Sequence, residues 1–435
     1  MQRLQGRKGG NGMLAVCGVL FLGLLILGVP IFMSMIIPCL AALHMNFPGM
    51  DMGLTIQRMV GGIDTFSLLS IPFFMYAADI MSKGDIGHKL VNFANKLVGH
   101  LPGGLAITTV VTCTIFGAIS GAGPAAIVAI GLILYPALCK DGYDPDSAIG
   151  CITASSTLAM LVPPGIAMIL YGVSAGASVG KLFMSGLSVG VLIAIVFSVY
   201  VCIDAIRNKI PRQKPATFKE VLQATGKAFW ALGLPVIILV GIYAGVMTPT
   251  EAAAVAVAYV LVVELFIYRS ITLKDVFEIG ITSGRMVAMI FILIGAGSLL
   301  SWILTAAQVP QKIVALTSGT SSYVILLIIN LLFLVAGMFM DPNSIVIVLT
   351  PLVLPMAQVI GLDTLHLGMI IVLNCAIGML TPPFGLNIFV SVGTFNRPFE
   401  RVVRPLWPYI FMMLFILVLV NLVPAISLWL PSRMA

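Results

Sequence analysis

Residues 116–124 read FGAISGAGP and residues 337–344 read GMFMDPNS, each inside a long apolar stretch. Glycine and proline interrupt the hydrophobic pattern there, where an apolar helix would otherwise continue. The flanks of the first stretch are too short for full membrane spans. A bare turn cannot face lipid, so the pattern predicts a re-entrant hairpin whose tip lies inside the protein. We predict hairpins at about 101–139 and about 310–360.

A proline pair interrupts the apolar segment that follows each predicted hairpin. Residues 147–173 contain Pro163 and Pro164, and residues 367–393 contain Pro382 and Pro383. Proline in a helix removes a backbone hydrogen bond, so both segments are predicted to be broken helices. A closing span follows each, at about 182–204 and about 405–430, and the same order of elements therefore occurs twice.

The composition places these segments in a membrane. Of the 435 residues, 60% are hydrophobic and 9% are charged, whereas soluble domains carry about 25% charged residues. At roughly 20 residues per span, the chain holds about ten to twelve spans. The apolar runs lack strand-like alternation, which argues against a β-barrel and predicts an all-α polytopic membrane protein.

The net charge of +7 is concentrated in short loops, a pattern of membrane topology and not of nucleic-acid binding. The strongest basic loop, 205–220, is predicted to be cytoplasmic. It divides the chain into a first repeat, 1–204, and a second repeat, 221–435. Counting spans from this loop, hairpin one opens from the cytoplasm and hairpin two from the periplasm. The repeats are therefore predicted to be inverted, with the C-terminus periplasmic.

The remaining segments are assigned by hydrophobicity. Arg3, Arg7 and Lys8 precede an apolar block, 13–46, without a clear cleavage site, which predicts a retained helix rather than a signal peptide. This block is either one kinked span or two short ones, so the side of the N-terminus stays open. Further spans are predicted at about 56–82, 226–247, 250–268 and 280–305, with an amphipathic interfacial helix near 83–97.

Polar residues at membrane depth are the candidates for a binding site, because they are rare and costly there. The predicted substrate ligands are Ser120, Ser155, Asp341, Asn343 and Thr381. The predicted sodium ligands, through side chains or backbone, are Gly117, Ser120, Gly123, Ser155, Gly337, Asn343, Gly378 and Thr381. Other polar residues of the same segments are Thr153, Ser156, Thr157, Ser344, Asn374 and Asn387.

The chemistry behind this choice is that Na⁺ prefers oxygen ligands, and a broken helix frees backbone carbonyls to supply them. The N-terminus of a half-helix also directs positive partial charge at an anionic substrate. Each residue has a structural alternative. Serine and threonine in membrane helices often bond to their own backbone, Asp341 can sit at a loop end in water, and Glu251 suits a helix start.

Motifs of other protein classes are missing from the sequence. No Walker A pattern is present, and the four histidines show no zinc spacing. No paired acids and no Ser–His arrangement suit an intramembrane protease. The sequence therefore predicts neither an ATP-driven motor nor an enzyme.

The chain resembles the large membrane subunit of tripartite ATP-independent periplasmic (TRAP) transporters, the DctM-like proteins. The resemblance covers about residues 55–395 in family order. Its motifs are IPFFMYAADIM at 71–81, GHLPGGLA at 99–106, FGAISG at 116–121, YG at 171–172, TPTEAAAVAV at 248–257, FMD at 339–341 and LTPPFG at 380–385.

The resemblance implies sodium-driven transport by an elevator mechanism, in which a mobile domain carries substrate past a fixed scaffold. It implies a bacterial inner-membrane location, a small four-helix membrane partner and a periplasmic substrate-binding protein. It also implies a small organic acid as substrate, such as a sialic acid, a sugar acid or a dicarboxylate. The alternatives are a stand-alone sodium/carboxylate symporter and, more remotely, an intramembrane enzyme.

Two departures from the family pattern affect specificity. The family often has Ser-Gly-Ser at the first hairpin tip and Pro-Pro-Ser in the first broken helix. Here Ala122 and Gly165 stand in place of the last serine of each motif. Backbone ligands would survive these changes, but hydroxyl contacts to substrate from these two positions would not.

Overall fold

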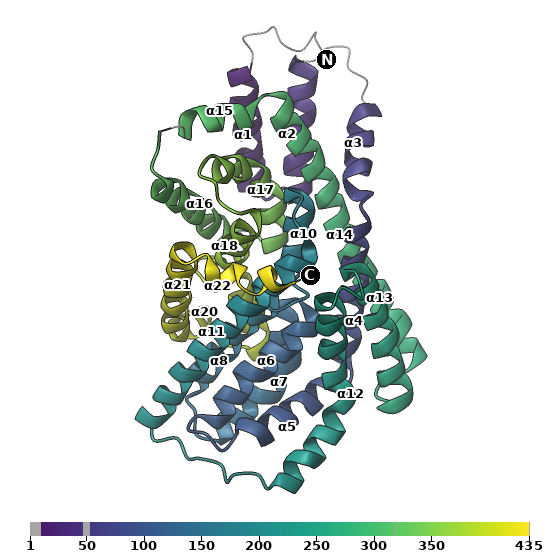
Figure 1. Cartoon of the computed structure of the whole chain (residues 1–435), viewed down its shortest axis with the longest axis vertical. Helices are drawn as coiled ribbons and strands as arrows, with labels where there is room; N and C mark the ends of the chain where they lie inside the picture. Colours follow the sequence, from purple (N-terminus) through teal and green to yellow (C-terminus); the bar gives the residue numbers. More distant parts are fainter. Residues whose placement is uncertain (1–9, 47–52, 318, 435) are drawn as a thin grey trace.

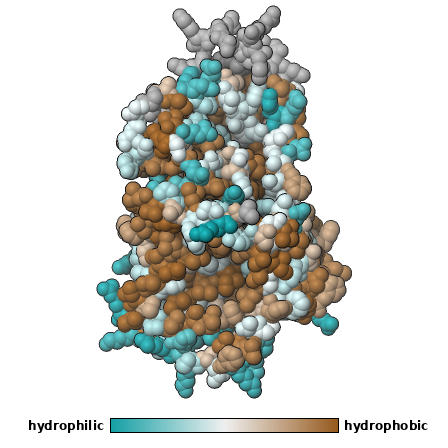
Figure 2. Space-filling view, in the orientation of Figure 1, coloured by the Kyte–Doolittle hydropathy of each residue, from teal (hydrophilic) through white to brown (hydrophobic). Residues whose placement is uncertain are grey.

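The computed structural model describes residues 10–46, 53–317 and 319–434, and these are folded entirely as helices and connecting turns. Eight helices are long and apolar enough to cross a membrane, or nine when one bent pair is counted, over this described part of the chain. Figure 2 shows the hydrophobic residues in a broad band around the middle of the molecule, with hydrophilic residues at its lower end. The chain is therefore a multi-pass membrane protein.

The first half, up to the basic linker, contains eleven α-helices. They are α1 (Gly10–Ile26), α2 (Ile31–Asn46), α3 (Gly53–Ile63), α4 (Ser70–Lys83), α5 (Ile86–Val98), α6 (Gly104–Ser120), α7 (Gly123–Lys140), α8 (Pro145–Ser156), α9 (Leu158–Leu161), α10 (Ile166–Ala175) and α11 (Val179–Arg207).

The second half follows the same plan. Its helices are α12 (Phe218–Tyr243), α13 (Pro249–Val262), α14 (Leu273–Ala306), α15 (Val309–Thr317), α16 (Ser322–Gly337), α17 (Pro342–Val359), α18 (Thr364–Gly378), α19 (Leu386–Phe395), α20 (Phe399–Val403), α21 (Trp407–Leu422) and α22 (Ala425–Leu428).

The two halves share the same order of hairpin, interrupted helix and closing helix. Helices α6 and α7 form one hairpin and α16 and α17 form the other, and the two enter from opposite ends of the molecule (Figure 1). The first is followed by the interrupted helix α8–α10 and the second by α18–α19. The closing helices α11 and α21 complete the plan. The fold is thus two inverted repeats, each with a re-entrant hairpin and a broken helix.

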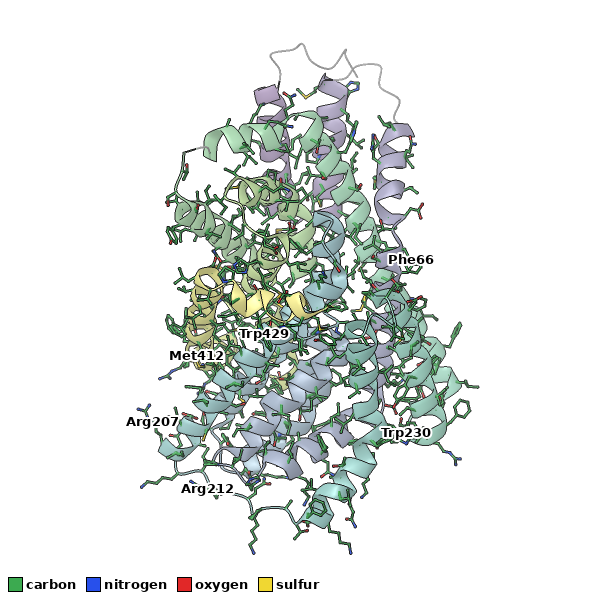
Figure 3. The ribbon with its side chains drawn as sticks, viewed as in Figure 1. Phe66, Arg207, Arg212, Trp230, Met412 and Trp429 are labelled. Carbon is green, nitrogen blue, oxygen red and sulfur yellow. The ribbon has the colours of Figure 1, made fainter. Side chains whose placement is uncertain are left out.

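The hairpins and the broken helices form one group, which we call the hairpin group. Six other helices form a second group, which we call the scaffold: α2, α3, α4, α12, α13 and α14. Within it, α13 packs on α4, and α14 packs on α2, α3 and α4. The amphipathic helix α5 joins the two groups, since it contacts α12 on one side and α6 on the other. The basic linker, with Arg207 and Arg212, lies at the lower end of the molecule in Figure 3.

The block 13–46 is two helices, α1 and α2, that pack against each other, which is the second of the two predicted alternatives. One predicted span differs from the structure: the span at 56–82 is bent by 63° between α3 and α4. At the bend Thr65 is extended and residues 66–69 form a 3-10 turn. Pro72 lies in the first turn of α4, where its missing N–H is tolerated, so the helix restarts just before it. Arg3, Arg7 and Lys8 lie outside the described residues.

Local sequence fixes several helix starts in the scaffold. Thr248 and Glu251 form a capping box at the start of α13, with the Glu251 carboxylate accepting the Thr248 N–H at 2.7 Å. The expectation that Glu251 belongs to a helix start is therefore confirmed. Equivalent boxes begin α12 at Thr217 and α14 at Thr272.

The joint between α4 and α5 is held by a buried carboxylate that is not among the predicted site residues. Glu264 accepts the backbone N–H groups of Asp85 at 3.3 Å and Ile86 at 3.2 Å, and the hydroxyl of Ser270. A Cβ at Gly84 would lie 2.2 Å from the Glu264 carboxylate, so glycine is needed for this approach. The bond ties the start of α5 to the scaffold.

Candidate functional site

The tip of hairpin one rests on the break of its own repeat's interrupted helix. Helix α6 ends at Gly121, which has φ +60° and donates its N–H to Gly117 at 3.0 Å. A Cβ at Gly121 would lie 2.1 Å from the Pro164 carbonyl oxygen. Gly117 approaches Ala159 just as closely, with a Cβ–Cα distance of 2.4 Å. The tip is therefore held by backbone contacts, which only glycine permits.

Hairpin two meets its interrupted helix in a similar way. A Cβ at Gly378 would lie 2.5 Å from the Cα of Gly337, so the two helices touch backbone to backbone. The N–H of Phe384, in the break, donates to the carbonyl of Met338 at 3.2 Å. Each repeat thus builds the same pairing of a hairpin tip with a helix break.

Both breaks contain a cis proline pair, Pro163–Pro164 and Pro382–Pro383. The first break separates α9 from α10, and the second separates α18 from α19. These interruptions leave backbone groups that no continuous helix uses. Such groups are potential ligands for a cation or an anion.

Asp341 begins the second helix of hairpin two. Its carboxylate caps α17 by accepting the Ser344 N–H at 3.1 Å, and it also accepts the Ser344 hydroxyl. An N-cap carboxylate stabilises a helix start through its charge and its hydrogen bond. Asp341 is half-buried rather than fully solvated, so it combines a structural role with access to the site.

A cavity of about 120 Å³ lies between the two hairpin tips. Gly121, Ala122 and Gly123 line it from hairpin one, and Asp341 and Asn343 line it from hairpin two. The rest of its wall comes from Pro124, Met160, Ile166, Ala167, Pro342, Met379 and Leu386. We call this space the tip cavity. It joins both repeats at one point, with a carboxylate and an amide on an otherwise apolar wall.

Only part of the predicted ligand set lines the tip cavity. Asp341, Asn343 and Gly123 do, whereas Ser120, Ser155 and Thr381 do not. The Thr381 hydroxyl bonds to its own helix, at the Ile377 carbonyl, 2.7 Å away. Gly117, Gly337 and Gly378 serve the close helix contacts described above. Their backbone oxygens remain predicted ligands.

Ser120 and Ser155 have a different property. Both hydroxyls are buried, and neither has a hydrogen-bond partner within the described residues. A buried polar atom without a partner is rare and needs an explanation, such as a bound ion or water. Hydroxyl oxygens suit Na⁺, so these two residues fit the predicted ion site. The side-chain oxygen of Asn387 is also buried without a hydrogen-bond partner in the described part of the chain.

Asn387 and its neighbours link the two repeats. Its amide nitrogen donates to the Ser156 hydroxyl at 2.9 Å, and the hydroxyls of Thr153 and Ser391 lie 2.7 Å apart. All four residues are fully buried. These bonds join α8 of the first repeat to α19 of the second. We call these four residues the inter-repeat polar cluster.

A second polar cluster contains two residues that the sequence reading did not select. The Asn374 amide donates to the Asn330 side chain at 2.7 Å, and Asn330 donates to Asn421 at 2.9 Å. The three residues come from α18, α16 and α21. Asn330 and Asn421 are isolated in long apolar runs, and a lone asparagine at membrane depth is the one signal that would have found them.

Comparison with solved structures gives the class of fold. The chain superposes on the YdaH transporter of Alcanivorax borkumensis with a TM-score of 0.63, covering 86% of this chain and 88% of that one at 15% sequence identity. The two proteins thus share a fold.

Sequence comparison gives the family. Residues 18–426 match the family described as "Tripartite ATP-independent periplasmic transporter, DctM component". The chain is 41% identical to the ectoine/5-hydroxyectoine TRAP transporter large permease protein of Ruegeria pomeroyi, over 94% of this chain and 96% of that one. It is 39% identical to the C4-dicarboxylate TRAP large permease of Pseudomonas aeruginosa, over 84% and 86%. This chain belongs to the DctM family and is the large subunit of a TRAP transporter.

Proposed function

We propose that this protein carries a small organic acid across the bacterial inner membrane, driven by sodium, with the substrate bound at the tip cavity. The observation that supports this proposal most directly is the meeting of both hairpin tips at one cavity containing Asp341 and Asn343. Backbone groups freed by the two breaks would supply the remaining polar contacts.

Relatives support the chemical class of the substrate. Related large permeases are named for ectoine, C4-dicarboxylates and 2,3-diketo-L-gulonate, and a related permease of Oleidesulfovibrio alaskensis is named for isethionate. Each of these solutes carries a carboxylate or sulfonate group on a small polar body. We infer an anionic or zwitterionic solute of this size for the present chain. A sialic acid remains a prediction.

Sodium would bind close to the hairpin tips and breaks. Ser120 and Ser155 supply unpartnered buried hydroxyls, and Asp341 supplies a negative charge. The amide oxygen of Asn343 and the backbone near Gly117, Gly123, Gly337, Gly378 and Thr381 complete the proposed set. The bound ion would neutralise Asp341 and so allow an anionic solute to approach it.

Movement would follow an elevator mechanism. The inter-repeat polar cluster joins the two repeats, and the scaffold meets the hairpins where α14 packs on α17 and where α4 packs on α6 and α7. One of these places is Gly297 of α14, where a Cβ would lie 2.0 Å from a methyl of Ile347. Small contacts of this kind allow one body to slide past another. A small membrane subunit would support the scaffold, and a periplasmic binding protein would deliver the solute.

Sodium is expected to stabilise the purified protein more than potassium or choline at equal ionic strength. A ligand that binds only the folded state adds about 2.7 kcal/mol at one hundred times its Kd. The measurement is the melting temperature in each chloride salt, and it requires no knowledge of the solute. Ser120→Ala should reduce the sodium-specific rise.

Thr112→Val is the matched control. Thr112 also lies on α6 and is buried without a partner in the described chain, but it is two turns from the tip. It should leave the sodium-specific rise intact. Equal melting temperatures in all three salts, with the small subunit also present, would contradict sodium binding.

A further inference from the structure

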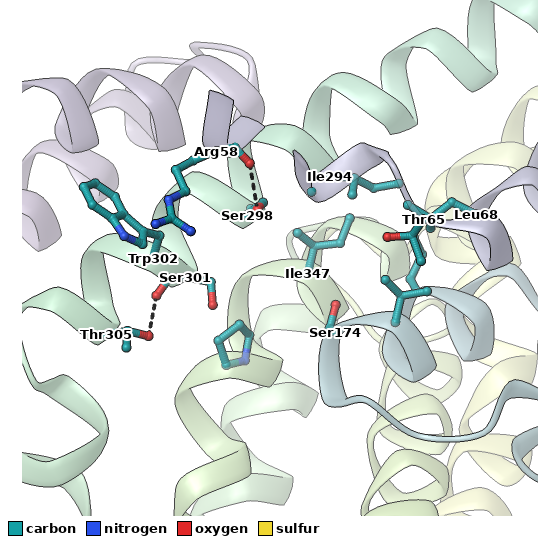
Figure 4. Close-up of a pocket in the computed structure, with 15 residues that line it drawn as sticks. Arg58, Thr65, Leu68, Ser174, Ile294, Ser298, Ser301, Trp302, Thr305 and Ile347 are labelled. Carbon is teal, nitrogen blue, oxygen red and sulfur yellow. Dashed lines mark hydrogen bonds between the residues drawn. The ribbon is translucent and has the colours of Figure 1, made fainter. Parts of the chain in front are cut away.

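A second cavity, of about 430 Å³, lies between the scaffold and the hairpin group. Its walls come from α3 and α14 on one side and from α10 and α17 on the other (Figure 4). Five of its lining residues, Thr65, Ser174, Ser298, Ser301 and Thr305, carry hydroxyl groups. We call this space the vestibule.

Arg58 is the one charged residue that lines the vestibule among the described residues. Its guanidinium lies 5.3 Å from the centre of the Trp302 ring. No ion pair is recorded for Arg58 in the described part of the chain. Among the residues that the structure describes, no protein anion therefore neutralises the positive charge in this cavity.

The structure holds Arg58 in place from two sides. The Ser298 hydroxyl donates to the Arg58 carbonyl at 3.0 Å, which fixes α3 against α14 (Figure 4). This approach needs Gly62, where a Cβ would lie 2.2 Å from the Cβ of Ser298. Trp302 then supports the side chain by a cation–π contact. An arginine whose side chain only extended into solvent would need neither the bond from Ser298 nor the contact with Trp302.

The vestibule and the tip cavity are lined by neighbouring turns of the same two helices, α10 and α17. Ala167 of α10 and Asn343 of α17 line the tip cavity, and Leu170 and Ile347, about one turn further along each helix, line the vestibule. Helices α3 and α10, which line the vestibule, lie in the upper half of Figure 1, away from the basic linker at the lower end of the molecule. With the linker cytoplasmic, the vestibule is on the periplasmic side.

We propose that the vestibule is a peripheral binding site for the anionic group of the transported solute, with Arg58 as its ligand. This inference rests on the proposed function and adds a second station to it. A guanidinium binds carboxylate or sulfonate through two parallel N–H donors. Trp302 would cover the less polar body of the solute, and Ser301 and Ser174 would bond to its polar groups.

We expect the vestibule to bind the solute weakly and to increase its rate of association. Arg58 is largely exposed to solvent, where a single ion pair is screened. Such a charge raises the local concentration of anions and their rate of arrival. Its loss should therefore raise the KM for uptake and leave kcat nearly unchanged.

Fluorescence of Trp302 tests the site without any knowledge of the solute. The chain has four tryptophans; replacing Trp230, Trp407 and Trp429 with phenylalanine leaves Trp302 as the reporter. Iodide, an anionic quencher, should quench it more strongly than neutral acrylamide does. Arg58→Gln should reduce iodide quenching by about twofold or more, because the local positive potential is lost, and leave acrylamide quenching unchanged.

Two variants serve as controls. Arg285→Gln removes an exposed arginine of α14 that lines no cavity described above, and it should leave iodide quenching unchanged. Arg58→Lys keeps the charge but not the two-pronged donor. It should retain iodide quenching, whereas protection of Trp302 from iodide by succinate, ectoine or isethionate should weaken.

Transport completes the test in proteoliposomes that contain the full transporter. Arg58→Gln is expected to raise KM about tenfold with little change in kcat, since a rim charge acts on association. Equal iodide quenching in Arg58 and Arg58→Gln proteins would overturn the proposal, even if sodium stabilisation is intact. Loss of sodium stabilisation with normal quenching would instead overturn the proposed coupling and leave the vestibule site standing.

Discussion

The substitution Gly121→Ala is expected to abolish transport while the chain still folds. Gly121 has φ +60°, which costs an alanine about 1–2 kcal/mol. Its Cβ would also lie 2.1 Å from the Pro164 carbonyl oxygen, a backbone atom that cannot rotate away. The tip must therefore move off the break. A displacement of about 1 Å at a positioned site lowers rates by roughly a hundredfold.

Gly176→Ala is the matched control for this variant. Gly176 also ends a helix, with φ +65°, but a Cβ there would meet nothing within 4 Å. Both variants carry the same backbone strain, and only Gly121→Ala carries the contact with Pro164. Uptake and sodium-dependent melting should be measured for both. If Gly121→Ala transports as well as Gly176→Ala does, the pairing of tip and break is not needed for function.

The substitution Asp341→Asn is expected to remove sodium coupling without weakening helix α17. Asparagine caps helices about as well as aspartate does, so α17 should keep its start. The negative charge facing the tip cavity is lost. Loss of a charged interaction of about 1.5–3 kcal/mol raises the Kd for sodium by roughly tenfold or more. Melting in sodium and sodium-driven uptake are the measurements.

Two further variants separate the roles of this side chain. Asp341→Ala removes the cap as well, so its melting temperature should fall in potassium too, by an amount corresponding to about 1 kcal/mol. Asp363→Asn is the control, because Asp363 caps α18 in the same manner and lines no cavity described above. Normal sodium-driven uptake by Asp341→Asn would exclude this carboxylate from the site.

The sequence predicted the features that depend on local chemistry. Glycine and proline interrupt apolar runs at the hairpin tips and the breaks, and these are the places where the structure turns. Glu251 was expected at a helix start, where its negative charge suits the dipole, and it does begin α13. Asp341 was selected because a carboxylate is costly in an apolar stretch, and it does line the tip cavity.

Features that depend on contacts between distant segments were not predicted. Glu264 lies near the end of an apolar helix, and its partners are residues 85 and 86, far away in sequence. Arg58 and Trp302 belong to different helices, and only their packing creates the vestibule. The bend at Thr65 was missed because hydrophobicity continues through it. The hydrophobic periodicity of one segment does not tell which side chains of a distant segment will contact it.

The span count predicts a periplasmic C-terminus. In Figure 1 the C-terminal end lies near the middle of the molecule. Helix α22 packs against α11 there. The periplasmic C-terminus therefore stays a prediction, which labelling of an added cysteine from either side of the membrane would test.

The inter-repeat polar cluster bears on how such a chain arises by gene duplication. Asn387 and Ser391 of one half complete the hydrogen bonds of Ser156 and Thr153 of the other. The hydroxyls of Thr153 and Ser156 also bond to carbonyls of their own half, but a half-length ancestor inserted alone would leave the Asn387 amide without its partner in hydrocarbon, at a cost of several kcal/mol. Such an ancestor would need a second copy inserted in the opposite direction. Dual orientation of one short gene product would then precede the fusion that fixed each half in a single orientation.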